Sequence, residues 1–95
     1  MTLEVIDLQW DDDGEEHVAK HGLSVAEVAQ VVANGYVIVK NRKARRAQYL
    51  MLGTTDGGRD LAVPIRRTQD LGTWRVVTAY DASDAQRQVL KDNRK

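Results

Sequence analysis

Basic side chains gather in the middle of this sequence, and they are the residues best suited to bind an anion. Residues 1–39 hold eight acids and one base, whereas residues 40–75 hold nine bases and three acids. A face built from the middle segment would be electropositive, although the formal net charge of the chain is zero. We therefore predict a surface that binds phosphate groups. Its candidate residues are Lys40, Arg42, Lys43, Arg45, Arg46, Arg66, Arg67 and Arg75.

The same side chains allow a second interpretation. Charged residues at strand ends also keep the edge of a sheet soluble and prevent edge-to-edge aggregation. The pattern alone favours the two roles about equally. A phosphate-binding groove differs in one measurable respect, because its affinity falls steeply as the salt concentration rises.

Two histidines lie four residues apart and share one face of a predicted helix. His17 and His21 have Asp13 one turn earlier, and such a group can hold a divalent metal ion. A third strong ligand is not evident in the sequence, so we predict no metal site. His21 directly precedes Gly22, where it is suited to binding the last carbonyls of the helix. It is also a candidate general acid or base if it faces a groove.

Lys20 and Tyr80 are the other candidate acid–base residues. Lys20 is the only base in the first 39 residues, and it either contacts a phosphate or is simply solvated. Tyr80 lies at the end of a predicted strand, where its hydroxyl is suited to catalysis or to contact with a phosphate. The alternative for Tyr80 is a half-buried ring with its hydroxyl in water.

Three helices are predicted to position these residues. The first begins in the acidic run 11–13, whose charges suit a helix amino terminus, and ends near Gly22. The second begins at Ser24, which forms an S-x-x-E capping box with Glu27, and ends at Asn34-Gly35. The last begins at Asp81 or Ser83, where Ser83 and Gln86 form a second box.

Alternating polar and apolar residues predict the strands, and glycine-containing turns between them predict antiparallel neighbours. We expect an α+β fold in which helices lie mainly on one face of a curved antiparallel sheet. Antiparallel pairing can bring Arg66 and Arg75 close together, because they lie at the facing ends of one hairpin. The expected strands lie within 3–10, 36–40, 48–53, 61–66 and 74–79.

The length of 95 residues predicts one domain spanning 1–95. The chain has no cysteine, which excludes disulfides and thiolate metal sites. Apolar runs are shorter than the roughly 20 residues that cross a bilayer. The start of the chain lacks the pattern of a signal peptide. We therefore expect a cytoplasmic protein.

Four segments of this sequence resemble the BrnT family, toxins of type II toxin–antitoxin systems within the RelE/ParE-like group. They are Trp10-Asp11, residues 18–24 followed by Glu27, residues 52–59, and residues 74–82. The resemblance implies a RelE-like β-α-α-β-β-β-β-α fold. It also implies a metal-independent endoribonuclease without a cofactor, which inhibits translation. The implied partner is a small ribbon-helix-helix antitoxin, and DNA would be bound only by the complex of the two.

With that activity, Arg66 and Arg75 are expected to stabilise charge on the scissile phosphate, because a guanidinium binds phosphate through two hydrogen bonds. Lys20, His21 and Tyr80 remain the candidates for general base and acid. Tyr80 stands where the BrnT family usually has an arginine. This difference keeps an alternative open, namely a module of the same fold that binds RNA or an antitoxin with weakened catalysis.

Overall fold

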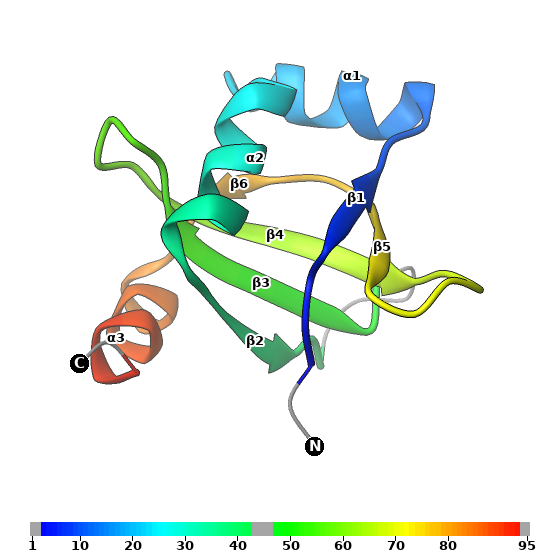
Figure 1. Cartoon of the computed structure of the whole chain (residues 1–95). Helices are drawn as coiled ribbons and strands as arrows, with labels where there is room; N and C mark the ends of the chain where they lie inside the picture. The colour runs from blue at the N-terminus through cyan, green and yellow to red at the C-terminus, as the bar shows by residue number, and fades with distance from the viewer. Residues whose placement is uncertain (1–2, 43–46, 94–95) are drawn as a thin grey trace.

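The structure is a computed structural model that describes residues 3–42 and 47–93 (Figure 1). The described residues form a small α+β fold with three helices and a mixed, open sheet of six strands. The elements in chain order are β1 (Asp7–Gln9), α1 (Asp12–Lys20), α2 (Val25–Asn34), β2 (Tyr36–Lys40), β3 (Tyr49–Thr54), β4 (Asp60–Arg67), β5 (Thr73–Val76), β6 (Tyr80–Asp81) and α3 (Asp84–Asp92).

Side-chain caps set the start of each helix. The Asp11 carboxylate accepts a hydrogen bond from the backbone N–H of Gly14 at 2.7 Å and caps α1. Ser24 and Glu27 form the predicted capping box at the start of α2. Ser83 and Gln86 form the second box at the start of α3. The sequence predictions for these starts are confirmed, because each cap depends only on residues within one turn.

The strand order is β1-β5-β4-β3-β2, and the short β6 pairs with β4 beyond the end of β5. Strands β3, β4 and β5 are antiparallel neighbours, as the turns between them predicted, and β2 is also antiparallel to β3. Strand β1 is parallel to β5, so the expectation of a purely antiparallel sheet is wrong. Turn residues fix the direction of strands joined by a short loop, but β1 and β5 have no such connection.

The expected strand 74–79 ends early, because β5 stops at Val76 and the next strand, β6, begins only at Tyr80. Val76 pairs with Ile65, and Tyr80 pairs with Ala62. The segment between Val76 and Tyr80 therefore contains one residue more than the segment of β4 opposite it. Pro64 lies between those two partners on β4, and its carbonyl accepts the N–H of Val77 at 3.0 Å. Proline donates no hydrogen bond, and it is typical of such bulged pairing.

Helices cover both faces of the sheet. Val18 of α1 and Val28 and Val31 of α2 pack with the buried side chains of one face, such as Met51 and Val63. Leu90 of α3 packs on the other face with Leu50, Leu52 and Ala62. Figure 1 shows α3 on the side of the sheet opposite to α1 and α2. The arrangement follows from strand alternation, because β3 and β4 place apolar residues on both faces. Within the described part of the chain, every helix is too short or too polar to cross a membrane.

Candidate functional site

Arg66 and Arg75 lie directly opposite each other on the antiparallel strands β4 and β5. Side chains in such a pair project from the same face, with Cβ atoms roughly 5 Å apart. Two like charges in this position oppose folding unless something compensates them. Within residues 3–42 and 47–93, neither arginine forms an ion pair with a carboxylate. The pair is therefore an unneutralised double cation, which is suited to an anion with two or more acceptor oxygens.

The two arginines line a cavity of about 200 Å³ together with the first turns of α1. They also line a neighbouring hollow of about 530 Å³ that opens over the end of the β4–β5 hairpin. A chain-like ligand could thus pass over the arginine pair from one hollow to the other. The smaller cavity is lined by Asp11, Asp13, Gly14, His17, Arg66, Arg75, Val76 and Val77.

His17 is the titratable ring in this cavity. Its Nδ1 lies 3.1 Å from the carbonyl oxygen of Val77. A carbonyl only accepts hydrogen bonds, so Nδ1 must carry the proton, and in the neutral ring Nε2 is left as the basic nitrogen. The backbone contact fixes the tautomer and the orientation of the ring. His17 thus lines the same cavity as Arg66 and Arg75, and Nε2 is the ring nitrogen that the Val77 contact does not use.

Gly14 makes the close approach of α1 to β5 possible. A Cβ atom at this position would lie 2.8 Å from the carbonyl oxygen of Val76, which is shorter than van der Waals contact. The residue is buried in the first turn of the helix. A side chain here would push α1 away from β5, and with it the ring of His17.

Asp11 and Asp13 give the cavity an acidic wall opposite the arginines. The Asp11 carboxylate is occupied by its capping bond to Gly14. Both carboxylates line the cavity, but neither comes within 4.0 Å of a guanidinium nitrogen of Arg66 or Arg75. The first helix therefore adds two carboxylates to the lining of the cavity without forming an ion pair with either arginine.

The other predicted acid–base residues lie apart from this cavity. Tyr80 pairs with Ala62, four residues before Arg66 on β4, which corresponds to about 13 Å along the strand. The ring of His21 lies beside Tyr80, with 6.2 Å between centroids. Lys20 is exposed at the end of α1. The structure thus divides the predicted catalytic residues into an arginine pair and a separate group around Tyr80.

Arg59 organises the region around Tyr80. Its guanidinium binds both carboxylate oxygens of Asp81 and donates to the carbonyls of His21 and Gly22 at 3.2 and 3.1 Å. The hydrogen bond from Arg59 lowers the pKa of Asp81 below its usual value, and the same bond raises the pKa of Arg59. These bonds join the turn between α1 and α2 to β6. Arg59 is therefore a structural cation.

The remaining candidate phosphate-binding residues surround the arginine pair unevenly. Lys40 and Arg42 are exposed at the end of β2, and the register places Lys40 two strands from Ile65, or about 10 Å away. Arg67 lines the larger hollow together with Arg66 and Arg75, and its guanidinium lies 5.5 Å from the centre of the Tyr49 ring. Lys43, Arg45 and Arg46 lie outside the described residues.

Sequence analysis missed His17 as a partner of the arginines. The spacing of His17 and His21 showed that they share a helix face, and the neighbouring Gly22 directed attention to His21. The contact that distinguishes them joins His17 to a carbonyl 60 residues away. Within the described part of the chain, no three His, Cys, Asp or Glu residues form a group that could hold a metal ion.

Comparison with known proteins adds a family. A family model described as a domain of unknown function, DUF4258, matches residues 11–81. The match runs from the cap of α1 to the end of β6, and it includes His17, Arg66 and Arg75. No curated protein matches the chain at a significant level.

Proposed function

We propose that this chain, which belongs to the DUF4258 family of domains of unknown function, cleaves RNA at the cavity between α1 and β5. One observation supports the proposal above all others. Two arginines without acidic partners among the described residues lie side by side, and they share a cavity with a histidine whose Nδ1 is fixed. This combination offers charge stabilisation and a proton acceptor, the two requirements for internal attack on a phosphodiester.

In the proposed reaction, Nε2 of His17 accepts the proton of a ribose 2′-hydroxyl. The 2′-oxygen forms a bond to phosphorus, and the bond from phosphorus to the 5′-oxygen breaks. The leaving oxygen takes a proton from water, and the hydroxide that remains takes the proton held on Nε2 of His17, so the products are a 2′,3′-cyclic phosphate and a 5′-hydroxyl. Arg66 and Arg75 bind the non-bridging oxygens, where negative charge increases in the transition state. DNA lacks the attacking hydroxyl, so it is not a substrate.

We further propose that the biological role is that of a toxin in a type II toxin–antitoxin system. The four segments that resemble BrnT toxins support this role. The partner in this proposal is a small ribbon-helix-helix antitoxin. Inhibition of translation would follow from cleavage of messenger RNA.

The direct test uses purified protein in EDTA with an RNA oligonucleotide of about 20 residues and a DNA of the same sequence. We expect shorter RNA products that end in a 2′,3′-cyclic phosphate, and intact DNA. His17→Asn keeps a donor near the place of Nδ1 for the Val77 carbonyl but cannot accept the proton, so the rate should fall by roughly 10²–10⁴. His21→Asn is the matched comparison on the same helix face, and it should change the rate much less. Intact RNA with the wild-type protein would refute the cleavage reaction.

An alternative function is binding of RNA or of an antitoxin with little catalysis. The position of Tyr80 favours it, because this residue stands where BrnT toxins usually have an arginine and lies about 13 Å along β4 from the arginine pair. In that case the wild-type protein would bind RNA at low salt without shortening it. Arg66→Ala would then weaken binding and the salt dependence together.

A further inference from the structure

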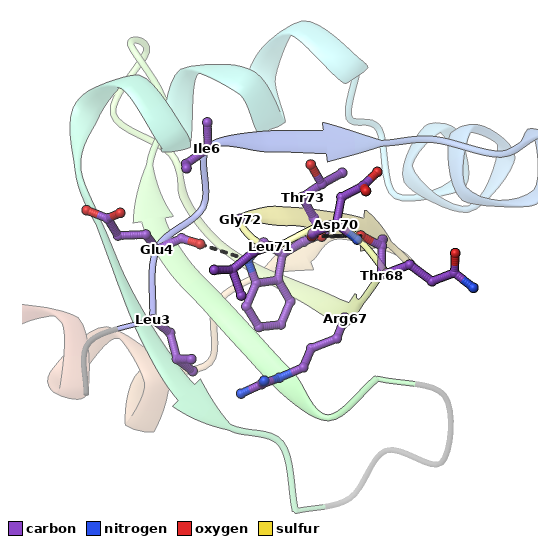
Figure 2. A pocket seen from close by; sticks show the side chains of 11 residues that line it. Leu3, Glu4, Ile6, Arg67, Thr68, Asp70, Leu71, Gly72 and Thr73 are labelled. Carbon is purple, nitrogen blue, oxygen red and sulfur yellow. Dashed lines mark hydrogen bonds between the residues drawn. The ribbon is translucent and has the colours of Figure 1, made fainter.

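An apolar cavity of about 320 Å³ lies at the end of the sheet between the N-terminal segment and the β4–β5 loop. Its floor is Trp74, which is buried and donates from Nε1 to the carbonyl of Glu4 at 2.9 Å. Leu3, Ile6 and Leu71 form its walls (Figure 2). Because Arg67 pairs with Trp74 while Arg66 pairs with Arg75, strand alternation places this cavity on the face opposite to the arginine pair.

Two apolar side chains in the walls of this cavity are unusually exposed to solvent. Leu71 is 97% exposed and Ile6 is 72% exposed. An isolated exposed leucine is ordinary, but two neighbours beside an apolar hollow form a patch of the kind that binds partners. A volume of about 320 Å³ is also at the lower end of the range of roughly 300–1,000 Å³ that ligand pockets occupy.

The loop that carries Leu71 is held in place by hydrogen bonds. The hydroxyl of Thr68 donates to the carbonyl of Thr73 at 2.7 Å, and the N–H of Asp70 returns a bond to that hydroxyl at 3.1 Å. The carbonyl of Gly72 accepts the N–H of Ile6 at 2.8 Å. The exposure of Leu71 is therefore a fixed feature of the fold, and its side chain is presented ready for contact.

The charges around the cavity indicate the chemistry of the partner. Glu4 and Asp70 lie on opposite sides of Leu71 (Figure 2), and both are exposed and without an ion pair in the described part of the chain. Among the described residues, the one cation in the lining is Arg67, and its guanidinium lies over the rings of Tyr49 and Trp74. An acidic rim repels the phosphates of a nucleic acid and attracts lysine or arginine.

We propose that this surface is a docking site for an extended peptide segment of a protein partner. One large apolar side chain of the peptide enters the cavity above Trp74, and basic residues on either side of it face Glu4 and Asp70. Strand β1 ends the sheet beside the cavity, so its outer edge can offer backbone hydrogen bonds to the same peptide. The cavity shares neither His17 nor the arginine pair with the proposed cleavage site, although Arg67, Thr68, Gln69 and Asp70 also line the hollow of about 530 Å³ beside that pair.

The test uses the full chain and three fluorescein-labelled peptides in anisotropy titrations. The probe is Lys-Val-Lys-Leu-Lys-Val-Lys, and the comparison peptides replace its lysines by glutamate or its apolar residues by serine. We expect saturable binding of the first peptide, and at least tenfold weaker binding of the other two. Leu71→Ser and Ile6→Thr should each weaken binding at least fivefold, and Val89→Ser, an exposed apolar residue on α3, should change it less than twofold.

Other occupants would appear as different outcomes, and each would overturn the proposal. If Leu71→Ser abolishes self-association in sedimentation while no peptide binds, the occupant is a second copy of the chain. If Leu71→Ser weakens binding of an oligouridylate and the basic peptide does not compete, the occupant is a nucleic acid. Equal binding of the basic and acidic peptides would remove the role of Glu4 and Asp70. Circular dichroism of each variant shows that a loss of binding is not a loss of folding.

Discussion

Strand β4 has an arginine at each end, and the two ends use this side chain differently. Arg59, just before the strand, gives hydrogen bonds to a carboxylate and two backbone carbonyls. Arg66, near the other end, faces Arg75 and has no carboxylate partner within residues 3–42 and 47–93. The comparison shows that a structural arginine and an arginine available to a ligand differ in the groups that they contact, although the residue type is the same.

The largest predicted effect is the loss of RNA cleavage when either arginine of the pair is replaced. Arg66→Ala or Arg75→Ala should each remove about 2–4 kcal/mol of transition-state stabilisation, or a factor of roughly 10²–10³ in kcat. Folding should be retained or improved, because each change relieves a like-charge pair. Rates on the RNA oligonucleotide and urea midpoints provide the two measurements. Arg87→Ala on the exposed side of α3 is the control. Full activity in both variants would contradict the role of the pair.

A smaller effect is expected where α1 touches β5. Gly14→Ala places a Cβ 2.8 Å from the Val76 carbonyl oxygen, so the helix must shift. Such overpacking costs about 1–3 kcal/mol, against a gain of about 1 kcal/mol in helix propensity. We expect a net loss of stability together with slower cleavage, measured by urea unfolding and by kcat. Gly57→Ala is a matched control, because its nearest atom would be 3.9 Å away. Unchanged cleavage would show that the distance from α1 to β5 does not matter.

The opposite end of β4 should respond in the opposite way. Arg59→Ala removes the bonds to Asp81 and to the α1–α2 turn, so the urea midpoint should fall. The salt dependence of RNA affinity should hardly change, since Arg59 lies away from both hollows lined by the arginine pair. Arg59→Lys should recover only part of the stability, because lysine cannot form the two-pronged contact. A steep loss of RNA affinity in Arg59→Ala would erase the distinction between the two ends.

The smallest predicted effect is a dependence of stability on acid. Since Arg59 lowers the pKa of Asp81 below the usual value of 3.8, the ionised pair stabilises the fold above that pH. The contribution is lost as the pH falls through the lower pKa of the folded state. Urea midpoints of wild type and Asp81→Asn should therefore differ near neutral pH and begin to converge only below about pH 4. A difference that stays constant down to pH 2 would show that the charge of Asp81 contributes nothing.

The sequence predicts those parts of the fold that short segments determine. The capping boxes at Ser24 and Ser83 depend on side chains three residues apart, and both are present. The pairing of Arg66 with Arg75 could also be anticipated, because one short hairpin joins their strands. The parallel β1–β5 pair and the position of α3 could not, because packing between distant segments decides them.

The residues of the candidate site also differ in whether the sequence alone could predict their positions. The arginine pair could be predicted from the hairpin, but the importance of His17 over His21 depends on which end of α1 meets Val77. No local pattern records that choice. The sequence likewise does not show that Leu71 and Ile6 are neighbours, because the hydrogen bond between Ile6 and Gly72 joins residues that are far apart in the sequence.

The contact between His17 and Val77 has a consequence for synthesis of the protein. The ribosome makes the helix that carries the histidine 60 residues before the carbonyl that orients it. Because pairing between such distant segments forms late in folding, a partly translated chain has no assembled cavity. The proposed cleavage of RNA would therefore begin only after Val77 has left the ribosome.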